Sequence, residues 1–123
     1  MLTGRFARQH RLTQASEFKN VFAAPVIKQG DANMLLLAIK NNQPTARLGL
    51  AVAKKQLKLA VSRNRFKRLT RESFRQHLNS MSSLDIVVIA RSGALRKSNQ
   101  ELLELLSKNW QILNKKCEKL SQV

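Results

Sequence analysis

Residues 61–78, VSRNRFKRLTRESFRQHL, stand between two apolar segments, RLGLAVAK at 47–54 and LDIVVIA at 84–90. The middle segment has the apolar periodicity of a helix, and the flanking segments have the composition of strands. This order predicts a βαβ unit with two parallel strands, in which the helix crosses over one face of the sheet. The strand at 84–90 is apolar almost throughout, which is typical of an inner strand covered on both faces.

The predicted crossover helix carries a row of positive charges on one side. At about 3.6 residues per turn, one stripe holds Asn64, Lys67, Arg68, Arg71 and Arg75, with Arg63 and Arg65 on either side of Asn64. Only Glu72 offsets the six cations of this segment, and like charges one turn apart cost roughly 0.2–0.5 kcal/mol per pair in an isolated helix. A surface that only keeps a protein in solution usually mixes both signs. The stripe therefore predicts contact with an external polyanion, while the side with Phe66 and Leu69 is expected to pack on the core.

The strand at 47–54 is predicted to have one bulky face and one nearly bare face. Its alternating residues are Leu48, Leu50 and Val52 on one side and Gly49, Ala51 and Ala53 on the other. A bare face allows close approach of a helix or of a ligand backbone. Lys54 and Lys55 mark the rim at which the strand ends.

A helix with two aromatic side chains is predicted near the N-terminus. Thr13 is a suitable N-cap, and the helix is expected to run to about Ala24, just before Pro25. Phe18 and Phe22 are one turn apart and project together. They either fill the core, as aromatic pairs at helical spacing usually do, or offer their rings to unstacked bases.

Two further segments predict a strand and a long helix. Residues 34–40, MLLLAIK, read as a buried strand, and the following NNQP at 41–44 predicts a hairpin loop to the next strand. Ser98 and Glu101 form a capping box. They precede an amphipathic helix whose apolar face, with Trp110, is expected to complete the core.

The composition limits the class of protein. With 123 residues, residues 1–123 are expected to form one domain, of which 1–10 would be a flexible basic leader. A net charge of +16 is typical of proteins that bind nucleic acid. The apolar runs are too short to span a membrane, and the N-terminus lacks the apolar segment of a signal peptide. A single cysteine, Cys117, fits a reducing compartment, so the protein is expected in the cytoplasm.

No residue pattern predicts catalysis by the protein itself. His10 and His77 are far apart, and the seven acidic residues are scattered singly, without the spacing of a metal site or a carboxylate pair. A phosphate-binding glycine loop and a nucleophile elbow are also missing. We therefore expect no catalytic residues, no metal ligands and no cofactor held by the protein.

The segments LGLAVAKK at 48–55 and AVSRNRFKRLTRESFR at 60–75 resemble the signature of the protein component of bacterial ribonuclease P. The RNR pattern of that family matches Arg63, Asn64 and Arg65. Upstream, RLTQASEFKNVF at 11–22 is similar to the family's first helix, with Phe18 and Phe22 at its paired aromatic positions. The resemblance covers nearly the whole chain.

This resemblance implies both a fold and a function. The fold is a two-layer α/β (α+β) sandwich of order αβββαβα, with the basic crossover helix between the last two strands. The implied function is to assist a catalytic RNA that removes the 5′ leader from precursor tRNA, by binding the leader and raising substrate affinity. The implied partners are that catalytic RNA, in a 1:1 complex with a monomeric protein, and precursor tRNA. The resemblance also implies that magnesium is held by the RNA and the substrate and not by the protein.

By resemblance, two sets of residues bind RNA. The basic helix would contact the catalytic RNA through Arg63, Asn64, Arg65, Lys67, Arg68, Arg71 and Arg75. The first helix and the sheet would bind the leader through Phe18, Phe22, Arg11, Lys19, Ala51, Ala53, Lys54 and Lys55. The chain departs from the family by having no tyrosine, and Ala38 stands where some members have an aromatic residue. Leader binding is therefore expected to depend more on phosphate contacts.

Two other classes of function are open at this point. A basic ribosomal or nucleoid-type structural protein would use the same helix on duplex phosphates, without preference for precursor over mature tRNA. A protein-only nuclease would need metal ligands that the sequence does not supply.

Overall fold

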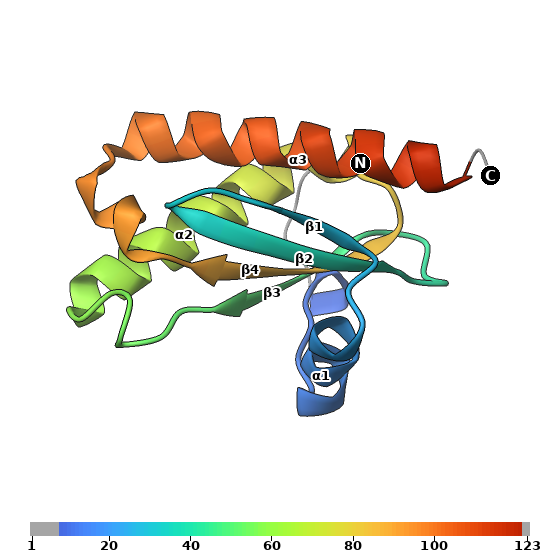
Figure 1. Ribbon diagram of the computed structural model, residues 1–123, viewed down its shortest axis with the longest axis horizontal. Coiled ribbons are helices and arrows are strands. Elements are labelled where there is room, and N and C mark those ends of the chain that lie inside the picture. The colour runs from blue at the N-terminus through green and yellow to red at the C-terminus, as the bar shows by residue number, and fades with distance from the viewer. Residues whose placement is uncertain (1–7, 122–123) are drawn as a thin grey trace.

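The computed structural model describes residues 8–121, in which a four-stranded sheet has helices on both faces (Figure 1). The elements are α1 (Ala15–Ala23), β1 (Ile27–Gly30), β2 (Met34–Lys40), β3 (Arg47–Ala51), α2 (Ala60–His77), β4 (Leu84–Ala90) and α3 (Asn99–Ser121), with short 3-10 helices η1 (Arg8–His10), η2 (Leu78–Ser80) and η3 (Ser92–Arg96). This is the predicted order αβββαβα. The first strand, β1, is the element that no residue pattern located.

The sheet has the strand order β1-β2-β4-β3. As predicted, β3 and β4 are parallel and β4 is an inner strand. The predicted hairpin at 41–44 is wrong, because β4 lies between β2 and β3 and pairs with both. A turn-forming sequence reverses the chain without deciding which strand becomes the neighbour. Here β4, which is buried on both faces, takes the central place that its apolar composition favours.

The larger part of the core lies between the sheet and the helices α2 and α3 (Figure 1). Trp110 is 1% exposed, as predicted, and meets Phe74 edge to face with ring centroids 5.7 Å apart. The indole N–H donates a hydrogen bond of 2.9 Å to Ser73 Oγ, so its polar atom is satisfied inside the core. Cys117 is also buried.

The other face of the sheet carries a smaller cluster under α1 (Figure 1). Leu12, Val21, Leu37 and Val87 are buried there. Because α1 is a short helix of nine residues, it covers only part of this face. Other apolar side chains on this side, such as Leu35 and Ile89, stay half-exposed.

Three predicted boundaries shift. The N-cap of α1 is Gln14 rather than Thr13, and Glu17 Oε1 accepts the backbone N–H of Thr13 at 2.8 Å and of Gln14 at 2.9 Å. The strand predicted to reach 54 ends at Ala51, because the chain then turns to bury Leu57. Of the expected leader, residues 1–7 lie outside the described residues, and Arg8–His10 form η1.

Candidate nucleic-acid interface

The cationic stripe of α2 faces away from the core. Its apolar side buries Phe66, Leu69 and Phe74 against the sheet and α3. On the stripe, Asn64, Arg68 and Arg71 are exposed, and Lys67 and Arg75 are half-buried. Glu72 Oε2 lies 4.0 Å from Arg68 Nη1, whose side chain is 61% exposed, and such surface pairs contribute only about 0–1 kcal/mol. The stripe therefore keeps its positive charge.

The two arginines that flank Asn64 bind other parts of the protein. Arg63 Nη1 donates to the carbonyls of Leu57 at 2.9 Å and Lys58 at 2.8 Å, in the turn before α2. Arg65 Nε donates to Asn99 Oδ1 at 2.6 Å, and its Nη2 donates to the Lys97 carbonyl. These bonds fix the entry into α2 and join that helix to the start of α3. Contact of either arginine with RNA stays a prediction.

Phe18 and Phe22 have different environments on α1. Phe18 is half-buried and lies directly on β3, where a Cβ added to Gly49 would be 2.6 Å from Phe18 Cε1. The bare face predicted for this strand is therefore what lets the ring approach. Phe22 is 45% exposed, so one aromatic residue packs while the other presents its ring to solvent. Lys19, between them in sequence, is exposed on the same helix.

Next to α1, the sheet offers a half-exposed apolar floor. Ala51 is half-buried and belongs to the apolar group under α1, as do Leu35 and Ile89. Ala53, Lys54 and Lys55 follow on the turn after β3, and all three are exposed. The expectation for Ala38 is wrong, because its side chain is buried in the core on the α2 and α3 side. An aromatic residue at that position would not reach the floor.

The chain matches the family model described as Ribonuclease P over residues 6–114. It belongs to that family. A ribonuclease P protein component from Pseudoalteromonas atlantica is 48% identical over 116 residues, which cover 93% of this chain and 94% of the relative. The component from Vibrio cholerae is 46% identical over 115 residues and covers 94% of this chain and 97% of the relative.

Solved structures agree with this assignment. The RNase P protein of Staphylococcus aureus superposes with a TM-score of 0.76 at 28% identity, over 85% of this chain and 94% of that one. The RNase P protein of Thermotoga maritima gives a TM-score of 0.66 at 30% identity, over 80% of this chain and 96% of that one. These matches do not favour the alternative of a ribosomal or nucleoid-type protein.

A partly buried ion cluster, in which only Asp85 is fully buried, ties α1 to the sheet. Arg47 Nη1 lies 2.8 Å from Glu17 Oε2, and its Nη2 lies 2.6 Å from Asp85 Oδ2. Arg47 Nε and Asn41 Nδ2 both donate to Asp85 Oδ1 at 2.8 Å. The pKa of Arg47 is raised, chiefly by its hydrogen bond to Asp85. The pKa of Glu17 is lowered, chiefly by the backbone N–H groups of Gln14 and Thr13, with Arg47 adding to the effect.

The sequence does not single out several residues that lie on the α1 side of the sheet. The sequence locates Leu35 and Ile89 only as strand residues, and their exposure depends on how little of the sheet α1 covers. Lys28 pairs in register with Leu37 and so points to the α1 side.

Within residues 8–121, His, Cys, Asp and Glu side chains do not gather in any group of three or more that could hold a metal ion. None of the helices described has the length and apolar composition that crossing a membrane requires.

Proposed function

We propose that this ribonuclease P protein binds RNA with two surfaces of one domain, while its RNA partner carries the catalytic centre. Family membership gives the general role, which is removal of the 5′ leader from precursor tRNA in tRNA maturation. The division of labour is our inference. The observation that carries it is the exposed cationic stripe of α2, which keeps its charge on an otherwise well-packed helix.

The stripe of α2 is proposed to contact the catalytic RNA in a 1:1 complex. Exposed Asn64, Arg68 and Arg71, with Lys67 and Arg75 beside them, match a surface that neutralises phosphates along a folded RNA. Guanidinium groups bind phosphate oxygens in pairs, which adds orientation to charge. Magnesium would be held by the RNA and the substrate, and the protein would hold no cofactor.

The α1 side of the sheet is proposed to bind the leader as a single strand. Phe22 offers an exposed ring, and Lys19, Lys54 and Lys55 are exposed around the apolar floor. Stacking of a base on an aromatic ring is worth about 1–3 kcal/mol and tolerates any sequence. A surface of this kind suits a leader whose sequence differs from one tRNA to another.

The charge of the whole protein would assist assembly. Two folded RNAs repel each other, and a protein of net charge +16 at their junction lowers that repulsion. The gain in substrate affinity should therefore fade as salt rises. We place this assembly in the cytoplasm, where its RNA partners are made in bacteria.

Reconstitution tests the proposal. Purified protein, the catalytic RNA and the two together are incubated with precursor tRNA while magnesium is lowered. We expect no cleavage by the protein alone, cleavage by the RNA alone only at high magnesium, and cleavage at low magnesium by the complex. Specific cleavage by the protein alone would show a protein-only nuclease. Equal affinity of the complex for precursor and mature tRNA would favour a structural RNA binder.

A further inference from the structure

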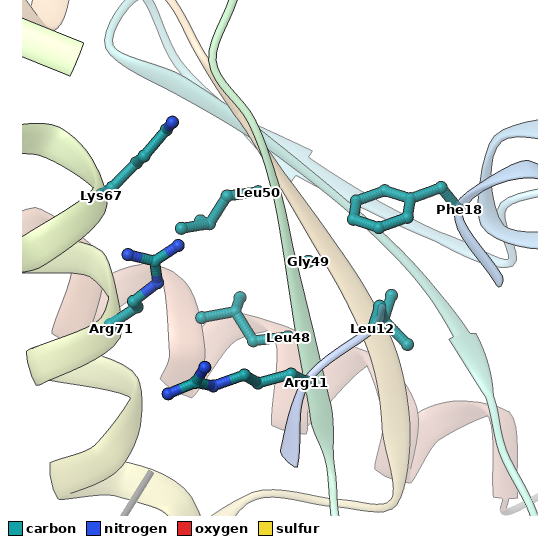
Figure 2. A pocket seen from close by; sticks show the side chains of 8 residues that line it. All are labelled: Arg11, Leu12, Phe18, Leu48, Gly49, Leu50, Lys67 and Arg71. Carbon is teal, nitrogen blue, oxygen red and sulfur yellow. The ribbon is translucent and has the colours of Figure 1, made fainter. Parts of the chain in front are cut away.

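A pocket on the outer edge of β3 brings together cations from two distant parts of the chain (Figure 2). It has a volume of about 170 Å³. Arg11, from the segment before α1, and Lys67 and Arg71, from α2, extend into the space between α2 and β3. The family resemblance implies leader contact for Arg11 and catalytic-RNA contact for Lys67 and Arg71, so the structure brings together residues that the resemblance places on separate surfaces.

The backbone of β3 adds to this pocket. The N–H of Leu12 donates to the Leu48 carbonyl at 3.0 Å, and Arg11 forms a single parallel bridge with Leu48. The N–H and C=O groups of alternate residues in a strand point to the same edge. Leu50, which lines the pocket, therefore directs its backbone groups to this edge beyond the bridge, where the N-terminal segment has already turned into α1.

The charges of the pocket select its ligand. None of the eight residues that line it is acidic, so the lining of this partly enclosed space carries three cations and no carboxylate, and it attracts an anion. Arginine guanidinium groups offer paired donors, lysine offers a point charge, and a backbone N–H offers a further donor. A phosphate group matches this combination of donors.

The pocket also continues around the edge of the strand. Phe18 and Gly49 line it from the α1 side, whereas Lys67 and Arg71 line it from the α2 side (Figure 2). A free phosphate ion would not need such a shape, but a nucleic-acid strand passing over the edge would use both sides. Its phosphate would meet the cations while its base lies near the Phe18 ring.

We propose that Arg11, Lys67 and Arg71 hold one phosphodiester of an RNA strand that crosses the edge of β3 and so links the leader surface to the catalytic-RNA surface. The proposal rests on the function proposed above. Two RNAs could supply the strand, the leader of precursor tRNA or the catalytic RNA, and the chemistry of the pocket is the same for both.

Double-mutant cycles on the full-length protein test this site. Arg11→Ala, Arg71→Ala and their combination are measured for affinity to the catalytic RNA. In the holoenzyme they are also measured for affinity to precursor tRNA with a long leader and with a leader of a single nucleotide. Each single substitution is expected to weaken binding about 10-fold, as for loss of a charge-assisted hydrogen bond. The double variant should lose clearly less affinity than the product of the two single losses, because both groups bind one phosphate.

Matched controls separate this site from general charge. Arg68 lies on α2, as Arg71 does, but outside the pocket. The loss of affinity in the Arg11→Ala and Arg68→Ala double variant should therefore equal the product of the two single losses. Lys108→Ala, in a hollow on α3 that also contains Glu101 and Glu104, should cost much less than 10-fold. Thermal unfolding of each variant shows that the fold is kept. Coupling between Arg11→Ala and Arg71→Ala that is seen only with the long leader assigns the strand to the substrate, and coupling in affinity for the catalytic RNA assigns it to that RNA.

Two results would overturn the proposal in different ways. If Arg68→Ala weakens binding of the catalytic RNA while Arg11→Ala and Arg71→Ala leave every affinity unchanged or act multiplicatively, the pocket is not a shared phosphate site, although the proposed function stands. If none of the substitutions on α2 changes RNA affinity, the proposed function itself fails.

Discussion

Arginines of α2 that are predicted to contact RNA differ in the hydrogen bonds that they make within the protein. Arg65 donates to Asn99 and to the backbone before α3, whereas Arg68 is 61% exposed beside Glu72. The sequence predicts both as RNA contacts because both lie near one helical stripe. It does not reveal the partner of Arg65, which lies more than thirty residues further along the chain and approaches only in the folded protein.

Arg65→Ala and Arg68→Ala should therefore differ in stability although they remove the same charge. Loss of the bonds from Arg65 should lower the free energy of unfolding by about 1 kcal/mol or more. Arg68→Ala should change it by less than about 0.5 kcal/mol, and relief of charge repulsion would act in the stabilising direction for both. Urea unfolding of the free protein measures the difference. Equal stabilities of the two variants would mean that the hydrogen bonds of Arg65 within the protein are no more favourable than hydrogen bonds to water.

Gly49 is the residue on which the position of Phe18 depends. Gly49→Ala would place a methyl group 2.6 Å from Phe18 Cε1, so the ring must move. We expect a loss of about 1–3 kcal/mol in stability and weaker binding of long-leader precursor tRNA. Affinity for the catalytic RNA through α2 should stay nearly constant.

A second substitution tests the cause of this effect. Phe18→Leu removes the ring atoms that the new methyl group meets, so Gly49→Ala should cost less stability in a Phe18→Leu background than in the wild type. Leader affinity should not recover, because the aromatic face is gone. Additive stability losses in the double variant would show that Phe18 is not what Gly49 accommodates.

At the scale of elements, the docking of α1 is what the sequence predicts least. The aromatic pair and the approximate bounds of the helix follow from spacing and from Pro25. The anchor on the sheet joins Glu17, Arg47 and Asp85, which are widely separated in the chain and carry no local pattern. The parallel pairing of β3 and β4 could be predicted, since a helix separates two apolar segments. The partner of β2 could not, since turn residues do not name a neighbour.

The lowered pKa of Glu17 makes the docking of α1 sensitive to acid. A carboxylate whose pKa is lower in the folded protein contributes stability above its unfolded pKa and loses it as the pH falls through the folded value. Glu17→Gln should reduce the free energy of unfolding by about 1 kcal/mol at neutral pH. Urea unfolding at pH values from about 7 down to about 3 should show the two proteins converging. A constant difference over that range would contradict an ionic role for Glu17.

At the scale of the molecule, the charge excess of the sequence predicts the kind of partner but not the shape that meets it. A net charge of +16 indicates a polyanion wherever the cations lie. Folding divides them between two faces of one sheet and brings Arg11 to Lys67 and Arg71 at the edge between them. The apolar floor with Leu35 and Ile89 likewise depends on how short α1 is relative to the strands.

Stacking contacts and phosphate contacts on the α1 side of the sheet should contribute to leader affinity with different dependence on salt. Lys54→Ala combined with Lys55→Ala removes two exposed cations from the proposed path of a single strand. Release of counterions contributes about 0.7 per phosphate contact to the slope of log affinity against log salt, so this variant should lower the slope for long-leader precursor tRNA by about 1.4. Phe22→Ala should weaken binding by stacking alone, about 1–3 kcal/mol, with the slope unchanged.

The comparison is made with the reconstituted holoenzyme, between precursor tRNA with a long leader and the same tRNA with a single leader nucleotide. On the short substrate all three proteins should bind alike, because the surface that the variants alter has no strand to hold. A change of slope in Phe22→Ala, or equal losses on both substrates, would mean that the leader does not run along α1 and the turn after β3. The exposed ring would then have to face the catalytic RNA instead.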